Sequence, residues 1–216
     1  MFGPIDIQRA IDMIIILLIS IDVHELAHAV VADRLGDQTP RRMGELSLNP
    51  LVHMDQVGIM LLLLTSISSF GFTYGRTHVT PSNLRFGPQR GNALVAIAGP
   101  ISNLVLAALL GTLLSLYLNG SITLSQQIVK FVFLALQINI ILFVLNLLPI
   151  PPLDGFSVVG GFLSARQMYS LAPVQQWGPL VLLVLFVADP QIHILGNILF
   201  PAVSHVSSLL CPACPQ

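Results

Sequence analysis

The stretch IIILLISIDVHELAHAVVA, residues 14–32, places two histidines and a glutamate inside an apolar segment. The apolar run around it begins near residue 7. At a rise of about 1.5 Å per residue, a helix over residues 7–32 can cross a hydrocarbon core of about 30 Å. We therefore expect a first transmembrane helix that carries HELAH, residues 24–28, at membrane depth.

The HELAH motif predicts a metal site with hydrolytic chemistry. His24 and His28 are four residues apart, so both lie on one helix face and can bind one ion. Glu25 points about 100° away from His24 around the helix, where it can act as a general base toward a water on the metal. Chance occurrence is the alternative, but unpaired imidazole and carboxylate groups inside a bilayer are destabilising by about 3 kcal/mol or more.

A catalytic zinc takes three protein ligands and leaves a further position for water. The best third candidate is Asp154 in NLLPIPPLDG, residues 146–155, where prolines end a long apolar helix and free the following backbone. An ordinary Asp-Gly turn at the membrane surface is the alternative. Asp12 and Asp22 are too close along the first helix to complete the cage easily, and Asp189 lies in an Asp-Pro turn. The predicted ligands of one zinc ion are His24, His28 and Asp154.

Composition places the chain among polytopic membrane proteins. Of its 216 residues, 54% are hydrophobic and 9% are charged, against about 25% charged residues in an average soluble domain. The net charge of −1 offers no basic surface for a phosphate backbone, so we expect no nucleic-acid partner. The lipid bilayer is the expected environment.

We expect an all-α polytopic membrane protein with about five transmembrane helices and a re-entrant hairpin or short β insertion between the first two core helices. The predicted helices after the first cover residues 93–118, 128–148, 174–188 and 192–210. Residues 57–72 form a shorter stretch diluted by Ser, Thr and Gly, and it is ambiguous between a span and a re-entrant hairpin.

The predicted organisation is one membrane-embedded domain over residues 1–216. Its catalytic core lies at about residues 7–160, and its C-terminal helices lie at about residues 174–210. The sequence does not indicate an oligomeric state.

Four motifs resemble the site-2 protease family of intramembrane zinc metalloproteases. HELAH and NLLPIPPLDG resemble its two signatures, while LNPLVHMDQVG, residues 48–58, and AIAGPISNL, residues 96–104, resemble stretches of its compact bacterial and archaeal branch without a PDZ domain. The resemblance implies zinc on His24, His28 and Asp154, with Glu25 as the general base. It also implies that Asn146 lies near the site and holds the substrate or the oxyanion, although a hydrogen bond between helices is the alternative for this residue.

One segment departs from the family's pattern. YGRTHVTPSNLR, residues 74–85, stands where relatives usually have a proline-rich stretch around a Lys-Pro pair. We therefore expect the loop at residues 76–85 to differ in shape or in substrate preference.

The ligand set predicts a topology. The histidines lie in the second half of the first helix, so Asp154 must follow a helix of the same direction, and residues 93–118 must run the opposite way. Residues 57–72 should then dip into the membrane and return. Seven arginines share the face of the metal site, namely Arg34, Arg41, Arg42, Arg76, Arg85, Arg90 and Arg166, which leaves Arg9 and Lys130 opposite. The positive-inside rule assigns the arginine-rich face to the cytoplasm.

The predicted function is hydrolysis of a peptide bond within or near a transmembrane segment of a membrane-protein substrate, as in regulated intramembrane proteolysis. Residues 44–75 are expected to help form the substrate groove, where an extended substrate could pair with a chain edge. The alternative is a non-enzymatic membrane metal carrier or an inactive protease-like scaffold, because intramembrane His and Asp residues also line ion pathways.

Three other features carry weaker expectations. His53 is either a partner near the groove or a surface or capping histidine. Asn103 is expected to join packed helices rather than to act in catalysis. Cys211 and Cys214 could bind a metal or form a labile disulfide, but a mobile tail is the favoured reading of this single CxxC pair.

Overall fold

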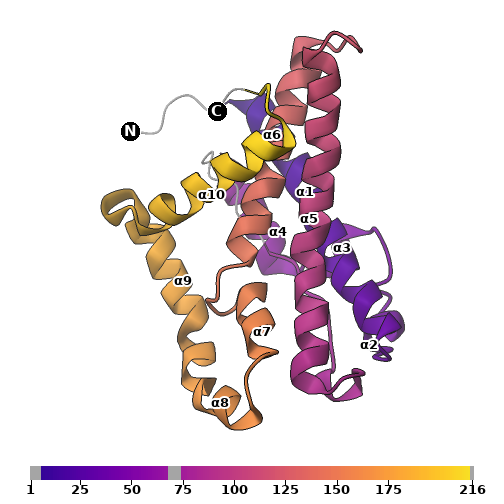
Figure 1. Ribbon diagram of the computed structural model, residues 1–216, viewed down its shortest axis with the longest axis vertical. Coiled ribbons are helices and arrows are strands. Elements are labelled where there is room, and N and C mark those ends of the chain that lie inside the picture. The colour runs from indigo at the N-terminus through magenta and orange to yellow at the C-terminus, as the bar shows by residue number, and fades with distance from the viewer. Residues whose placement is uncertain (1–5, 68–73, 215–216) are drawn as a thin grey trace.

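The computed structural model describes residues 6–67 and 74–214, and within these two ranges the protein is helical and contains no strand (Figure 1). The helices are α1 (Ile7–Arg34), α2 (Thr39–Arg42), α3 (Pro50–His53), α4 (Gln56–Ile67), the 3-10 turn η1 (Pro81–Asn83), α5 (Pro88–Leu118), α6 (Gln126–Asn146), α7 (Asp154–Gly160), α8 (Ala165–Ser170), α9 (Ala172–Ile192) and α10 (Ile194–Leu210). The predicted all-α class is confirmed for the described residues.

Three helices form the centre of the bundle and are long and apolar enough to cross a membrane. They are α1 with 28 residues, α5 with 31 and α6 with 21. The mean hydropathy over the most apolar 18 residues of each helix is 2.0, 2.2 and 2.5, respectively. Capping side chains fix where two of them begin, because Asp6 accepts from the backbone N–H of Arg9 and Ser125 accepts from that of Ile128. The three predicted core spans are therefore present as helices.

The side chains of α1 are sorted by what surrounds them. Ile7, Ile11, Ile15 and Ile19 recur every fourth residue and remain 42–70% exposed, as expected of a face that meets lipid. The opposite face is buried in the bundle. In the N-terminal half of α1 this face packs against α4 and α6 through Met13, Ile16, Leu17 and Ile21. In the C-terminal half of α1 the buried face is polar and carries the HELAH motif.

The contacts between the long helices give their relative directions. His28 of α1 contacts Val95 near the start of α5, while Asn103, two turns further along α5, contacts Ser20, two turns earlier in α1. The two helices are therefore antiparallel. Asn103 also contacts Asn139, and Tyr117 at the end of α5 contacts Gln126 at the start of α6, so α6 runs parallel to α1. These are the directions that the ligand set required.

The predicted count of about five spans is not confirmed. The segments expected at residues 174–188 and 192–210 are helical, as α9 and α10. However, Gly161 lies against Ala93 at the start of α5, whereas Cys211 contacts Ser115 near its end. The two C-terminal helices together therefore travel the length of α5 once, as Figure 1 also shows.

The predicted re-entrant hairpin at residues 57–72 is described only in part. Its first half belongs to α4, which is described up to Ile67 and packs against α1. Residues 68–73, where the chain would turn back, lie outside the described ranges. A short β insertion does not occur in the described part of this segment, which is helical up to Ile67.

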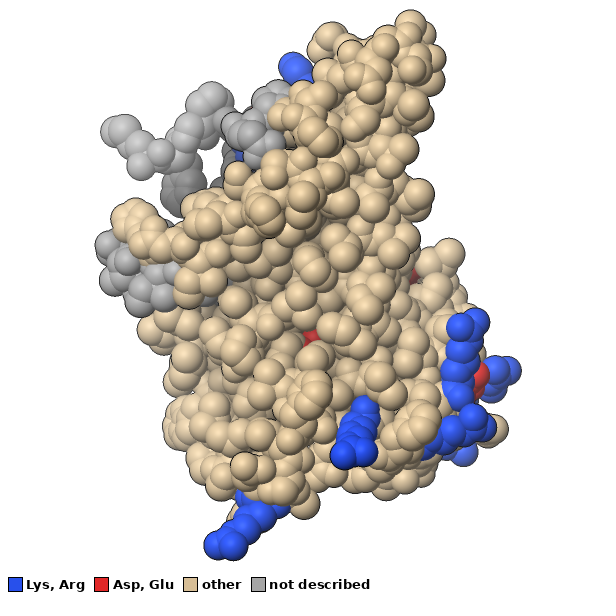
Figure 2. Space-filling view, viewed as in Figure 1, with Lys and Arg blue, Asp and Glu red and all other residues tan. Residues whose placement is uncertain are grey.

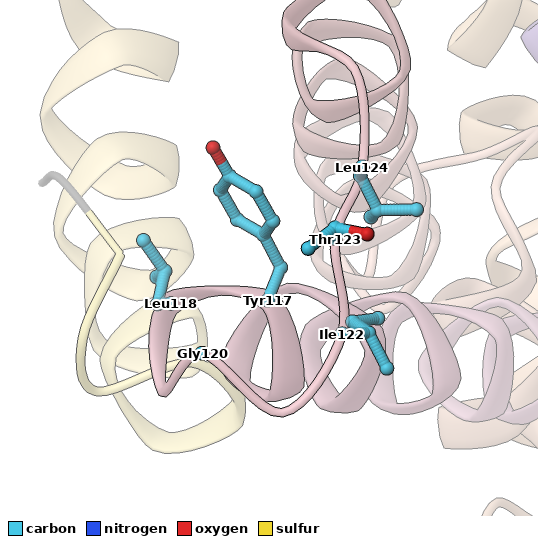
Figure 3. Close-up of a pocket in the computed structure, with 6 residues that line it drawn as sticks. All are labelled: Tyr117, Leu118, Gly120, Ile122, Thr123 and Leu124. Carbon is cyan, nitrogen blue, oxygen red and sulfur yellow. The ribbon is translucent and has the colours of Figure 1, made fainter.

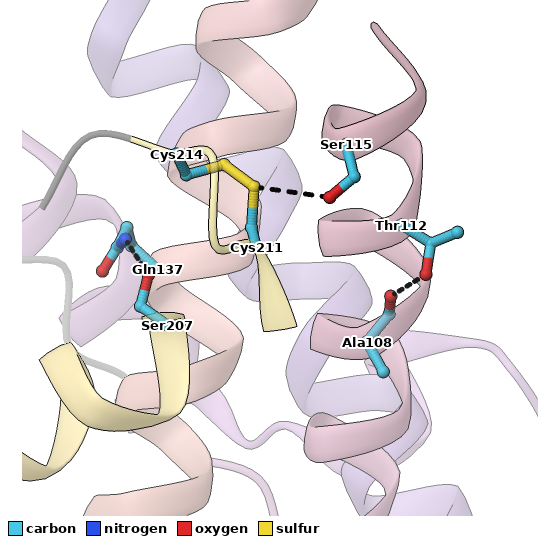
Figure 4. Close-up of a disulfide and its surroundings, with 7 residues drawn as sticks. All are labelled: Ala108, Thr112, Ser115, Gln137, Ser207, Cys211 and Cys214. Atoms are coloured by element: carbon cyan, nitrogen blue, oxygen red, sulfur yellow. Dashed lines mark hydrogen bonds between the residues drawn. A yellow bond between two sulfur atoms is a disulfide. The ribbon is translucent and has the colours of Figure 1, made fainter. Parts of the chain in front are cut away.

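The C-terminal cysteines are joined by a disulfide, so the expectation of a mobile tail was wrong (Figure 4). Cys211 is completely buried in a cluster formed by α5, α6 and α10, and the Ser115 hydroxyl donates to its sulfur at 3.7 Å. Gly111 allows this close approach, because a Cβ at that position would lie 2.7 Å from the carbonyl oxygen of Leu210. Packing of α10 against α5 therefore holds the CxxC pair in place.

Charge is distributed unequally between the two ends of the molecule. Figure 2 shows most of the Lys and Arg side chains gathered at the lower end in this view, where α1 ends and α5 begins. At this end Asp33 pairs with Arg41, whereas Asp37 and Glu45 are buried in internal hydrogen bonds. The surface of this end is therefore mainly basic.

At the opposite end, a hollow of about 430 Å³ lies beside the turn from α5 to α6 (Figure 3). It is lined by Tyr117, Leu118, Gly120, Ile122, Thr123 and Leu124. More than twenty residues of α5 separate this hollow from Val95, which corresponds to roughly 30 Å of helix. The hollow is therefore remote from the HELAH motif.

Candidate metal centre

Three side chains that are distant in sequence converge in the bundle. Nε2 of His24 lies 3.1 Å from Oδ2 of Asp154, and Nε2 of His28 lies 3.3 Å from the same oxygen. All three potential ligand atoms lie within 4.8 Å of one another. Two ligand atoms that are each about 2 Å from a tetrahedral zinc lie about 3.3 Å apart, so this spacing fits one zinc ion.

Hydrogen bonds to the far side of each imidazole determine which nitrogen is available. Nδ1 of His24 donates to the side-chain oxygen of Asn103 at 2.6 Å, and Nδ1 of His28 donates to the carbonyl oxygen of Val95 at 2.8 Å. The carbonyl oxygen of Val95 can only accept, which places the proton of His28 on Nδ1. For His24 the assignment follows from the orientation of the Asn103 amide. In their neutral form, both imidazoles therefore present an Nε2 lone pair to the position between them and Asp154.

A network of buried amides fixes the orientation of Asn103. Its Nδ2 group donates to the carbonyl of Ser20 at 3.2 Å and to Oδ1 of Asn139 at 3.1 Å. Asn139 in turn donates to the Ser20 hydroxyl at 3.0 Å. Because both amide protons of Asn103 are engaged, its oxygen is the atom that faces His24. The expected helix-joining role of Asn103 is present, and the contact with the imidazole adds a role that the sequence did not indicate.

Two glycines create the space that the site needs. A Cβ at Gly99 would lie 2.5 Å from Nε2 of both His24 and His28, so the absence of a side chain leaves room beside the two nitrogens. Gly155 follows Asp154 directly, and a Cβ there would lie 2.3 Å from the carbonyl oxygen of Leu147. This close approach brings the start of α7 back under the end of α6, which puts Asp154 within reach of α1.

Glu25 is buried beside the site but is not one of the three converging residues. Its Oε2 accepts a hydrogen bond from the Thr77 hydroxyl at 2.8 Å. Gly75 packs against its side chain, because a Cβ at Gly75 would lie 2.5 Å from Cγ of Glu25. Thr77 was not singled out by the sequence, since a threonine in a polar loop is common and nothing in its neighbours indicates Glu25.

Asn146 is the one predicted site residue that the contacts do not bring to the metal position. Its Nδ2 donates to the carbonyl oxygen of Leu142 at 2.9 Å, one turn earlier in α6. A polar side chain that donates to a carbonyl of its own helix needs no donor or acceptor from another element for that N–H group. A role for Asn146 in holding the substrate or the oxyanion therefore stays a prediction.

His53 is buried, so the alternative of a surface histidine was wrong. Its Nε2 lies 3.1 Å from the carbonyl oxygen of Ser47 and 3.7 Å from the carboxylate of Asp22. Asp22 accordingly faces His53, and it is not one of the converging metal-site residues, in line with the expectation from its position on α1.

Comparison with known proteins agrees with this geometry. Residues 117–188 match the family described as peptidase family M50. A protein named "Putative zinc metalloprotease YwhC" from Bacillus subtilis is 36% identical over 193 residues, which cover 87% of this chain and 85% of that protein. The chain belongs to peptidase family M50. The resemblance to site-2 proteases, drawn from four short motifs, is thereby confirmed.

Two further relatives are longer than this chain. Proteins named "Putative zinc metalloprotease Rip2" from Mycolicibacterium smegmatis and Mycobacterium tuberculosis are 34% and 33% identical over 79% of this chain. The chain spans 64% of the length of each of these two proteins. No solved structure matches the chain. Together with α1, α5 and α6, the family assignment identifies a membrane protein of a peptidase family.

Proposed function

We propose that this M50 protein is an intramembrane zinc metalloprotease that cleaves a peptide bond within or near a transmembrane segment of a membrane-protein substrate. The observation that carries the proposal is the convergence of His24, His28 and Asp154 on one position, with Glu25 buried next to it. Two relatives whose names describe zinc metalloproteases support the choice of metal.

In this proposal His24, His28 and Asp154 would hold one zinc ion, which would supply a Lewis acid for the scissile carbonyl and would lower the pKa of water so that it loses a proton and becomes a nucleophile. The two imidazoles act as neutral Nε2 ligands because Asn103 and Val95 accept their Nδ1 protons. Glu25 accepts the proton of the attacking water and delivers it to the leaving amine. Asn146 is proposed to bind the substrate near this position.

The substrate must be extended where it is cut, because a helix hides its carbonyl groups in backbone hydrogen bonds. Residues 74–80 suit an extended partner. The backbone N–H groups of Arg76, His78 and Thr80 donate inward, to the His53 carbonyl and to the carboxylates of Glu45 and Asp37. Alternate residues of an extended segment direct their N–H groups to opposite edges. The other edge, at residues 75, 77 and 79, is proposed to pair with the unwound substrate beside Glu25.

The metal position is proposed to lie nearer the cytoplasmic face of the cell membrane. The histidines occupy the second half of α1, on the side where the exposed arginines gather. Only Arg9 and Lys130 lie near the start of α1 and of α6, at the other end. An excess of Arg on one side of a membrane protein marks the cytoplasmic side.

Purified protein tests the proposal when it is reconstituted in lipid vesicles with a generic single-span substrate. We expect about one zinc per chain and cleavage that a zinc chelator abolishes. The Glu25→Gln variant should keep its zinc and lose cleavage by about 100- to 10,000-fold. Cleavage at the wild-type rate by this variant would defeat the mechanism.

The same experiment separates the rival function, a non-enzymatic metal carrier or inactive scaffold. A carrier has no need of a general base, so it would show zinc uptake into vesicles that Glu25→Gln leaves nearly unchanged. A protease shows the opposite pattern, with substrate cleavage that depends on Glu25 and no zinc transport. His28→Ala and Asp154→Ala should both lower the zinc content of the protease.

A further inference from the structure

Thr77 contacts the proposed general base from outside the helix that carries it. The hydroxyl oxygen of Thr77 lies 2.8 Å from Oε2 of Glu25 and 3.0 Å from the backbone oxygen of the same residue. A hydroxyl has one proton, so it can donate to either oxygen, and the ionised carboxylate is the stronger acceptor. Glu25 is 7% exposed, which leaves little water to replace this donor.

The segment that carries Thr77 is held on both sides of it. The backbone N–H of Arg76 donates to the His53 carbonyl at 2.8 Å, and that of His78 donates to Oε2 of Glu45 at 2.9 Å. The His78 ring also contacts the Glu45 carboxylate. Because Glu45 is itself 1% exposed, this attachment is internal to the protein. The position of the Thr77 hydroxyl is therefore set by its neighbours as well as by its bond to Glu25.

The same segment confines the rest of the glutamate side chain. A Cβ at Gly75 would lie 2.5 Å from Cγ, 2.8 Å from Oε1 and 2.9 Å from Cδ of Glu25. Gly75 thus packs directly on the side chain, while Thr77 engages Oε2. Oε1 lies beside Gly75 and accepts no hydrogen bond from the described residues, so its lone pairs stay available for a proton.

We propose that Thr77 is a positioning residue for Glu25, which fixes one carboxylate oxygen so that the other faces the attacking water. This inference rests on the proposed protease function. It assigns a role to the segment 74–85, which departs from the pattern that the site-2 protease resemblance led us to expect. The hydroxyl acts through orientation, so its removal should slow the chemical step and leave binding of substrate and zinc intact.

The test compares two substitutions of Thr77 in the reconstituted protein. Thr77→Val keeps the shape and removes the donor, and we expect kcat to fall by about 10- to 100-fold while KM and zinc content stay within about twofold. Thr77→Ser keeps the donor and should restore kcat to within about threefold of wild type. Thr80→Val is the matched control, because the Thr80 hydroxyl contacts Thr39 instead of Glu25.

Each outcome decides the inference. A Thr77→Val protein with wild-type kcat overturns it, as does a Thr77→Ser protein as slow as Thr77→Val, because the residue would then be needed only for shape. Loss of zinc or a rise in KM in Thr77→Val also overturns it, since the residue would then support the fold or the ligands. If wild-type protein cleaves no single-span substrate, the proposed function itself fails, and this arm is independent of the variants.

Discussion

The side-chain oxygen of Asn103 lies 2.6 Å from Nδ1 of His24, so an amide on α5 orients a proposed zinc ligand on α1. The amide is completely buried, and its two protons bond to Ser20 and Asn139. One side chain thereby joins α1, α5 and α6 at the level of the site. The contacts that orient His24 are therefore also contacts that pack the three helices together.

Replacing Asn103 with Leu should weaken zinc binding. The imidazole of His24 loses the acceptor that keeps its proton on Nδ1, and we expect the zinc dissociation constant to rise by about 10- to 100-fold. Competition with a chromogenic chelator measures this constant. Thr112→Val on the same helix is the control, because the Thr112 hydroxyl bonds only to the carbonyl of its own helix at Ala108 (Figure 4). An unchanged dissociation constant in Asn103→Leu would show that the amide serves packing alone.

Replacing Gly99 with Ala should block the metal position. The new methyl group would lie 2.5 Å from Nε2 of both His24 and His28, the two nitrogens that are proposed to bind the ion. We expect zinc content, measured by elemental analysis, to fall at least about tenfold. Gly160→Ala is the control, because its added methyl would meet only the flexible end of Met168, at 3.1 Å. Full zinc occupancy in Gly99→Ala would place the metal elsewhere.

The sequence predicted the elements that depend on long-range regularity. An apolar run of more than twenty residues can satisfy its backbone in a bilayer only as a helix, so α1, α5 and α6 followed directly from hydropathy. The His24 and His28 pair followed from helical spacing. The approach of Asp154 followed from chemistry, because a zinc site needs a third ligand and few carboxylates can reach it.

The parts that the sequence missed depend on contacts between separate segments. Thr77 and Asn103 are ordinary polar residues until the chain folds, and the fold brings them to Glu25 and His24. The C-terminal pair was read as a tail because CxxC carries no signal about packing, whereas Gly111 lets α10 approach α5 closely. The count of spans was uncertain because hydropathy does not show whether α9 and α10 together pass along the bundle once or twice.

The stability of the loop beside the site should depend on pH through Asp37. Burial opposes ionisation of this carboxyl, but hydrogen bonds from Thr39, Thr80 and Asn83 outweigh it and lower the pKa of Asp37 below its ordinary value of 3.8. A lowered pKa in the folded protein stabilises the fold above about pH 4, and this contribution disappears as pH falls through the folded value.

The Asp37→Asn variant isolates that contribution. An amide would present an N–H group to one of the N–H donors of Thr39, Thr80 or Asn83, so we expect a loss of roughly 1–3 kcal/mol at neutral pH. Thermal melting in detergent should show a constant difference from wild type between about pH 7 and 5, and a smaller difference below about pH 4. A difference that grows toward low pH would contradict the assignment. Asp33→Asn is a matched comparison at the same end of the molecule, because its partner Arg41 is exposed.

The disulfide provides a test of the orientation in the membrane. Cys211 contacts Ser115, which lies twenty residues after Val95 on α5, so the disulfide and the metal position are separated by roughly 30 Å along that helix. If the arginine-rich end is cytoplasmic, the disulfide faces the outside of the cell, where disulfides form and persist. The proposed orientation and the observed disulfide therefore agree on independent grounds.

Thiol labelling of intact cells decides the orientation, since Cys211 and Cys214 are the only cysteines of the chain. In a protein with both cysteines replaced by Ser, a cysteine introduced as Ser121→Cys in the exposed turn from α5 to α6 should react with a membrane-impermeant maleimide without permeabilisation. A second protein, with both cysteines replaced by Ser and with Arg166→Cys in the exposed helix α8, should be labelled only after permeabilisation. The reverse pattern would turn the protein over in the membrane and place the metal site outside, because α8 and the metal position lie toward the same end of α5.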